Sequence, residues 1–359
     1  MNDGSVCFFQ DRGRKYPFTA GAEALPLLRG LLRVNERVFA IAKERVEATG
    51  NVRGIMAEGE ALYADKPTMK QHHGAKGTWS DDEYAHPGLQ SVYLRLKSFQ
   101  RFTESWALLE RAAESGLLEL LLSPMDDKMV VASLGGGPGY ELLACDWFLR
   151  YWRSTRNASA DEKRAWLREH DFLKSQADDG DDDVGSASMD LVSLDLQPSW
   201  APYVHALGED SLHNYSFAQW DVHADESAVL ATRRACGAES IQLCLISNVM
   251  VYCSDEATAD VLTQLLAGGV RAILINERGA DQRIVGMVQR RGVVVLRLMR
   301  QEAGRDDRQL VFLPPGSDLL DSLPSVWHEN GTAEKLSYAT FPPKSPVFPN
   351  VPYEENKFL

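Results

Sequence analysis

Three glycines at alternating positions are the part of the chain best suited to bind a ligand. They are Gly135, Gly137 and Gly139, within the stretch SLGGGPGYE (133–141). Glycine lets the backbone adopt positive φ and approach a ligand closely, and the free amides that begin a following helix favour an anionic group. The stretch lies between an apolar run and a helical pattern, which predicts a strand–turn–helix unit built around a cofactor.

The spacing of these glycines separates two classes of cofactor. A dinucleotide fingerprint requires G-x-G-x-x-G/A. Here Gly135 and Gly137 occupy the first and third positions of that pattern, and Tyr140 occupies the sixth, where its side chain would obstruct close packing of helix on strand. The pattern is G-x-G-x-G, and no catalytic Tyr/Lys or His pair is evident. A nicotinamide oxidoreductase is therefore disfavoured, and S-adenosylmethionine is the other cofactor that uses such a loop.

Polar side chains follow later apolar runs at the points where strands should end. Asp195 and Asp221 follow two such runs, and Ser247 and Asn248 follow a third. Because ligands bind outside the carboxyl ends of parallel strands, these residues should meet the glycine loop. A carboxylate can accept two hydrogen bonds from a vicinal diol, although Asp195 could instead cap a helix, since Pro198 follows it.

The elements that must position these residues are short apolar runs alternating with helical segments. Continuous apolar runs are typical of parallel strands buried on both faces, and the alternation predicts right-handed crossovers. Only residues 300–307 separate the last two runs, which is too short for a helical crossover and predicts an antiparallel hairpin. The fold class is therefore α/β, a doubly wound, mostly parallel seven-stranded sheet. Its strands are expected at 129–134, 189–196, 215–220, 241–247, 270–276, 293–299 and 308–314.

This ordered set resembles the class I S-adenosylmethionine-dependent methyltransferases. The G-x-G-x-G loop is similar to their motif I, and five strands plus a hairpin match their seven-stranded sheet, whose last strand is antiparallel. The resemblance covers about residues 126–315 and implies a cofactor-binding domain over 126–320. It implies that Asp195 holds the ribose hydroxyls and that Asp221 accepts a hydrogen bond from the adenine amino group.

The resemblance implies a cofactor site made of the loop and the strand ends. Two features depart from the family: Ser133 stands where an acid is frequent, and the segment between Gly139 and Asp195 is long. We assign the extra length to an acidic insertion, with 175–188 expected to be disordered. Trp220 is expected either to flank the adenine ring or to lie in the core. The implied cofactor-binding residues are Leu134, Gly135, Gly136, Gly137, Gly139, Glu141, Asp195, Leu196, Trp220, Asp221, Val222, Ser247 and Asn248.

Methyl transfer from a sulfonium is an in-line displacement that requires alignment and does not always require a base. Three residues are weak candidates for a catalytic role. Asn248 could orient an acceptor or cap a strand end, Tyr252 follows it, and Glu277 could be a base or a solvated loop acid. In RNA cytosine-C5 methyltransferases the nucleophilic cysteine follows a proline. Cys253 does not follow a proline, so we expect it to be a small, partly buried thiol and not a nucleophile.

Residues 1–125 have helical patterns and little strand signal, and we expect a helical module that forms a lid. Helices are expected over 24–48 and within 90–122, as one helix or two, with a loop over 69–88 between them. The His and acidic residues of this loop match no metal-ligand spacing, so no metal site is expected. Arg95, Lys97 and Arg101 supply positive charge that could simply be a solvated surface. The segment 321–359 is expected to be a proline-rich extended tail.

The composition of the chain limits which kinds of partner and which cell compartment we expect. The 359 residues carry a formal net charge of −13, and the excess acid lies outside residues 1–125, which disfavours non-specific binding to nucleic acids or anionic membranes. No apolar run is long enough to span a bilayer, and the five scattered cysteines fit a cytoplasmic or nuclear protein.

The methyl acceptor stays open between RNA, protein and a small molecule. RNA is slightly favoured, because the N-terminal module could bring a bulky substrate to the sheet edge. The alternative is a catalytically inactive, methyltransferase-like scaffold or assembly subunit with a protein partner. The missing acid at Ser133 permits that reading.

Overall fold

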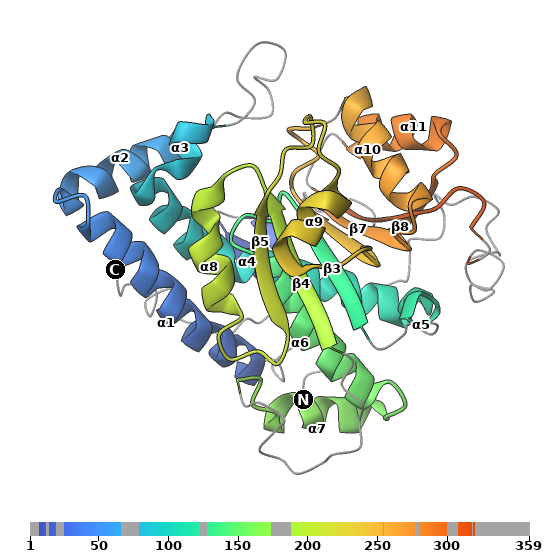
Figure 1. Ribbon diagram of the computed structural model, residues 1–359. Coiled ribbons are helices and arrows are strands. Elements are labelled where there is room, and N and C mark those ends of the chain that lie inside the picture. Colours follow the sequence, from blue (N-terminus) through green and yellow to red (C-terminus); the bar gives the residue numbers. More distant parts are fainter. Residues whose placement is uncertain are drawn as a thin grey trace.

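A computed structural model describes residues 7–11, 14–18, 25–65, 79–122, 128–173, 188–253, 255–277, 281–299, 308–317 and 319 (Figure 1). The expected extended tail over 321–359 lies outside these residues. So does the expected disorder over 175–188, apart from Ser188 at the start of a strand.

A seven-stranded sheet forms the centre of the molecule. Its order is β5-β4-β3-β6-β7-β9-β8. β3 to β7 are mutually parallel, whereas β9 is antiparallel to both β7 and β8. The predicted parallel sheet with a terminal antiparallel hairpin is therefore confirmed. The strands are β3 (Lys128–Leu134), β4 (Ser188–Asp195), β5 (Asn214–Gln219), β6 (Leu243–Ser247), β7 (Ala272–Glu277), β8 (Val294–Met299) and β9 (Arg308–Leu313).

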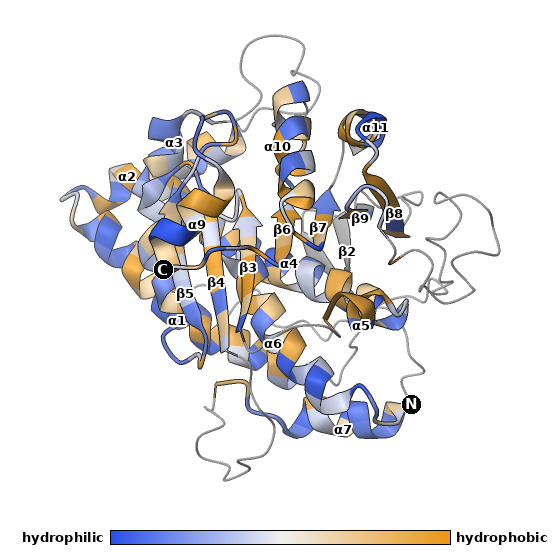
Figure 2. Cartoon of the chain, turned by 45° about the vertical axis from the view of Figure 1, so that its right-hand side comes forward, coloured by the Kyte–Doolittle hydropathy of each residue, from blue (hydrophilic) through white to orange (hydrophobic). Residues whose placement is uncertain are grey.

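Alternate residues of each strand enter two separate cores, one on each face of the sheet. On β3, Met129 and Val131 belong to one core, while Val130, Ala132 and Leu134 belong to the other. Figure 2 shows β3 and β6 as mostly hydrophobic strands between the two helical layers. The first face is covered by α1 (Leu25–Glu47), α4 (Pro87–Glu114), α6 (Tyr140–Thr155) and α8 (Ala201–Leu207), and the second by α9 (Ala228–Cys236), α10 (Glu256–Ala267) and α11 (Asp281–Arg290).

The helical pattern expected over 24–48 is present as α1. The pattern over 90–122 belongs to two helices, α4 and α5 (Leu117–Leu122), because the chain turns at Gly116, whose φ is +77°. The segment 69–88 is not wholly a loop. It contains α3 (Asp81–Ala85), whose first turn is closed by a capping box between Ser80 and Glu83.

One strand pair was not expected from the sequence. β1 (Cys7–Asp11) pairs antiparallel with β2 (Arg14–Phe18), so residues 1–125 are not purely helical. This hairpin packs against α4. Its strands are only five residues each, too short for a clear alternating pattern.

α4 joins the N-terminal helices to the sheet. It packs against α1, α2 (Val52–Ala64) and α6, and its Phe102 and Trp106 belong to the same core as Met129 of β3. The N-terminal helices thus form part of the layer over one face of the sheet. Two shorter elements complete the described fold, α7 (Ala160–Glu169) and the single-turn helix η4 (Pro198–Trp200). No helix in the described ranges has the length and apolar character needed to cross a membrane.

Candidate functional site

The glycine loop joins β3 to α6. Gly135, Gly137 and Gly139 have φ of +66°, +50° and +89°, in the left-handed region that favours glycine. The amides of Gly135 and Gly136 both donate to the carbonyl oxygen of Leu194 on β4, at 2.7 and 3.3 Å. A Cβ on Gly135 would lie 2.6 Å from Val249, so packing as well as φ excludes a side chain there.

Gly137 differs from Gly135 and Gly136 because a Cβ at this position would overlap with no described neighbour. Its nearest neighbour would be Trp200, 3.8 Å away, which is ordinary contact. The residue lines a cavity, and its amide donates to Asp195 Oδ2 at 2.9 Å. Ser193 Oγ donates to the Gly137 carbonyl oxygen at 3.0 Å and fixes the peptide from behind. The loop is therefore held rigidly with one bare face toward the cavity.

Asp195 ends β4 beside this loop. Its Oδ1 accepts the amide of Gln197 at 2.9 Å, and its Oδ2 accepts that of Gly137. Burial raises the pKa of Asp195 to about 6, although both backbone hydrogen bonds oppose the rise. Each carboxylate oxygen keeps capacity for a further donor. The capping alternative does not hold, because the side chain of Gln197 caps η4 by accepting from Ser199.

The cavity in front of the loop has a volume of about 240 Å³ and is open to solvent. Small-molecule sites are concave pockets of this kind, lined mainly by apolar and aromatic side chains with a few polar groups. Four residues expected at the cofactor or catalytic site do not line it: Gly136, Gly139, Glu141 and Glu277. Those that do are Leu134, Gly135, Gly137, Asp195, Leu196, Trp220, Asp221, Val222, Ser247, Asn248 and Tyr252.

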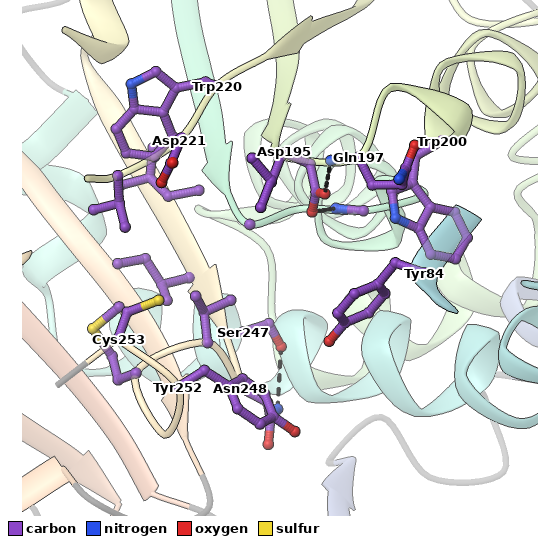
Figure 3. Close-up of a pocket in the computed structure, with 18 of the residues that line it drawn as sticks. Tyr84, Asp195, Gln197, Trp200, Trp220, Asp221, Ser247, Asn248, Tyr252 and Cys253 are labelled. Atoms are coloured by element: carbon purple, nitrogen blue, oxygen red, sulfur yellow. Dashed lines mark hydrogen bonds between the residues drawn. The ribbon is translucent and has the colours of Figure 1, made fainter. Parts of the chain in front are cut away.

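The end of β5 supplies another part of the wall. Trp220 is 6% exposed and belongs to the core, as expected, and it also lines the cavity; that it flanks the adenine ring stays a prediction. Its Nε1 donates to the carbonyl oxygen of Glu226 at 2.9 Å. Asp221 is more exposed, and its Oδ1 accepts the amide of His223 at 2.9 Å. An adenine-sized ring against Trp220 would thus have a carboxylate at its edge (Figure 3).

Asn248, directly after β6, has a strained backbone. Its φ is +57°, and it is the one non-glycine residue of the described chain with positive φ. Its backbone amide donates to the carbonyl oxygen of Asn276 at 2.8 Å. Its side-chain Nδ2 lies 3.4 Å from both Glu104 Oε2 and Ser247 Oγ. Such strain persists only where the surroundings determine it, and it clusters at functional sites.

The sequence interpretation missed one side of the cavity, which comes from the N-terminal helices and η4. The side chain of Tyr84 on α3 points between Asp195 and Ser247 (Figure 3). The interpretation of Lys97 and Arg101 as a solvated surface is wrong, since they are 7% and 8% exposed. The sequence did carry one signal of this burial: polar residues recur regularly among the apolar residues of 90–112. The missed wall residues are Trp79, Asp81, Tyr84, Tyr93, Arg101, Gln197 and Trp200.

Two acidic residues near the loop are buried. Glu277 is 1% exposed, so its interpretation as a solvated loop acid is wrong. Glu141 is 4% exposed in the first turn of α6, and burial raises its pKa to about 7. Burial likewise raises the pKa of the Cys253 thiol to about 12, which keeps it protonated and a poor nucleophile. Within the residues that the structure describes, no group of three or more His, Cys, Asp or Glu could hold a metal ion.

The order and directions of the seven strands decide the fold. It is the class I methyltransferase fold. Tyr140, which argued against dinucleotide binding, is buried beneath the loop and donates through its hydroxyl to Asn35 of α1 at 2.7 Å. The bulky residue at this position thus packs α6 against an N-terminal helix.

Three solved structures illustrate the likeness. Magnesium protoporphyrin IX methyltransferase from Synechocystis PCC 6803, with bound S-adenosylmethionine, has a TM-score of 0.36 and 9% identity, covering 67% of this chain and 100% of its own. The CurJ carbon methyltransferase has a TM-score of 0.35 and 9% identity, covering 66% and 64%. An S-adenosylmethionine-dependent methyltransferase from Clostridium acetobutylicum has a TM-score of 0.36 and 5% identity, covering 58% and 92%. With TM-scores below 0.5 and identities of 9% or less, these likenesses carry no argument, and the fold is assigned from the order and directions of the strands.

No protein-family model matches the sequence. No curated protein is significantly similar to it in sequence.

Proposed function

We propose that this chain is an S-adenosylmethionine-dependent methyltransferase. The observation that carries the proposal is the bare face of Gly137, which lies on the cavity wall with its amide fixed on Asp195. The positive φ of Gly137 favours glycine, and among the described residues none lies closer than 3.8 Å to the position of a Cβ, which leaves room for a ligand to approach the backbone.

The residues around the cavity fit the parts of this cofactor. Asp195 keeps lone pairs for the two ribose hydroxyls, and Trp220 with Asp221 offers a flat wall and an acceptor for the adenine amino group. Ser247 and Asn248 lie at the end of β6, next to the switch point of the sheet between β3 and β6. The methyl group would therefore face the side of the cavity that these two residues share with Tyr84.

The bound cofactor supplies a methyl group that the positive sulfur already activates. The chain has to exclude water and align the acceptor with that methyl, since orientation carries most of such a displacement. Asn248 and Tyr252 line the cavity, and their polar side chains suit them to orient an acceptor by hydrogen bonds. Glu277 is not placed to act directly, because it lies outside the wall.

The acceptor is proposed separately. The sequence favours RNA slightly, whereas Asp81, Asp195 and Asp221 line the cavity and repel phosphate groups. A neutral or cationic acceptor, as a small molecule or a protein side chain, suits this wall better. The sequence and the cavity wall therefore favour different acceptors. Filter binding over a salt series tests the RNA option, and absence of affinity for RNA at low salt removes it.

Transfer of labelled methyl into a cell extract tests the activity and sorts the acceptor. The label should enter one fraction, defined by sensitivity to RNase or protease, and Gly137→Trp should abolish it. The scaffold alternative predicts no transfer together with a stable protein partner on pull-down. Transfer that is the same with Gly137→Trp would contradict the proposed site.

A further inference from the structure

Arg101 is a buried cation in the cavity wall that the proposed function has not used. Its Nε donates to Tyr93 Oη at 3.4 Å, and its Nη1 lies 3.3 Å from Glu104 Oε2 and 3.4 Å from Ser247 Oγ. Among the described residues, none accepts from Nη2. A guanidinium that is 8% exposed and retains free donors is well suited to a carboxylate, which it binds in a planar fork.

Two carboxyl groups lie close to this cation. Glu104 is the neighbour of Arg101 on the same helix, and its side chain is 3% exposed. Its Oε1 accepts from Gln100 at 2.9 Å, and its Oε2 lies 3.4 Å from Asn248 Nδ2. Glu141, in the turn after the glycine loop, lies near enough that Arg101 opposes the rise of its pKa and Glu104 adds to it. Neither carboxyl group lines the cavity, whereas Arg101 does.

Arg101 is therefore the residue of this group that can meet a ligand. A guanidinium edge that faces the cavity is complementary to a carboxylate, and such a charge-assisted pair is stronger in a nearly dry place.

We propose that Arg101 binds the α-amino-acid end of S-adenosylmethionine, pairing through Nη2 with the carboxylate of the methionine moiety. The inference rests on the proposed function and adds to it a residue on α4, away from the strand ends. It also gives α4 a role in binding the cofactor, beyond covering the sheet.

A pair of ligands tests the inference by calorimetric titration. S-adenosylhomocysteine carries the α-amino-acid end, and 5′-methylthioadenosine keeps the adenosine and the sulfur but lacks that end. Arg101→Met should weaken binding of S-adenosylhomocysteine by about 10- to 100-fold, as expected for lost charge-assisted hydrogen bonds. Binding of 5′-methylthioadenosine should stay within about twofold of the wild-type value. Arg95→Met is the matched control on the same helix, away from the cavity wall, and should change neither affinity.

The outcomes separate the inference from the proposed function. Equal weakening of both ligands by Arg101→Met would mean that Arg101 only shapes the cavity, and it overturns the inference. Wild-type protein that binds both ligands equally well overturns it too. Wild-type protein that binds neither ligand overturns the proposed function. If Arg101→Met does not fold, Arg101→Lys replaces it, since lysine keeps the charge but not the fork and should selectively weaken S-adenosylhomocysteine.

Discussion

Protonation of Asp195 should make cofactor binding depend on pH near 6. Burial raises the pKa of this carboxyl to about 6 in the free protein. A ribose diol donates hydrogen bonds to the ionised form, so binding requires the carboxylate. Between pH 8 and pH 5 the ionised fraction falls to about one tenth, and the affinity for S-adenosylhomocysteine should fall about tenfold from this group.

The stability of the free protein should change in the opposite direction. A carboxyl whose pKa is raised by folding contributes stability that is complete below the unfolded pKa and is lost as the pH rises through the folded one. Acidification through pH 6 therefore relieves the cost of burying the Asp195 charge while it weakens the ligand. Opposite trends in melting temperature and affinity distinguish this mechanism from acid unfolding.

Calorimetric titrations at pH 8, 7, 6 and 5 test the prediction on wild type and Asp195→Asn. The variant should bind about 10- to 100-fold more weakly at pH 8, because a charge-assisted acceptor is lost, and should lack the Asp195 part of the pH dependence. Glu141, whose pKa burial raises to about 7, titrates in the same range, and Asp195 contributes to that rise. Repeating the comparison in a Glu141→Gln background therefore isolates Asp195. Asp190→Asn, on the same strand at the opposite end, is the control and should bind like wild type.

A wild-type affinity that stays constant from pH 8 to pH 5 would refute this reasoning. So would an Asp195→Asn variant with the pH dependence of wild type.

Three further substitutions follow from the geometry of the loop and the wall. Gly135→Ala should lower the free energy of unfolding by about 2–4 kcal/mol in urea titrations, since left-handed backbone and the overlap with Val249 both oppose a Cβ; an unchanged value would contradict the observed loop. Asn248→Gly should retain the stability of wild type within about 1 kcal/mol, because glycine accepts positive φ, while methyl transfer falls; equal activity would remove Asn248 from the reaction. Cys253→Ser should keep methyl transfer, and Cys253 should react slowly with iodoacetamide at pH 8, because burial raises the pKa of its thiol to about 12. Loss of transfer in that variant would instead point to a nucleophilic thiol.

The sequence was sufficient for the parts of the site that follow local rules. Gly137, Asp195 and Ser247 are far apart in the chain, yet each follows an apolar run, and the carboxyl ends of parallel strands meet at one edge. The hairpin of β8 and β9 was predictable for a similar reason, because the segment between them is too short for a crossover.

The part of the cavity wall that the N-terminal helices supply could not be predicted from such local rules. Whether Arg101 faces solvent or a cavity depends on how α4 crosses the sheet, and that is set by packing against α1, α2, α6 and the β1–β2 hairpin. Helical periodicity identifies one buried face, whereas most of α4 is buried around its circumference. The burial of Glu277 could not be predicted for the same reason. Glu277 ends β7, which lies between β6 and β9, and α4, from a distant part of the sequence, packs against this strand.

Titration of the protein with S-adenosylhomocysteine tests the central claim most directly. The account predicts one molecule bound per chain at micromolar ligand, and loss of this binding in Gly137→Trp, whose side chain would fill the space beside Asp195 and Trp200. Absence of binding at high micromolar ligand, or undiminished binding by Gly137→Trp, would contradict it.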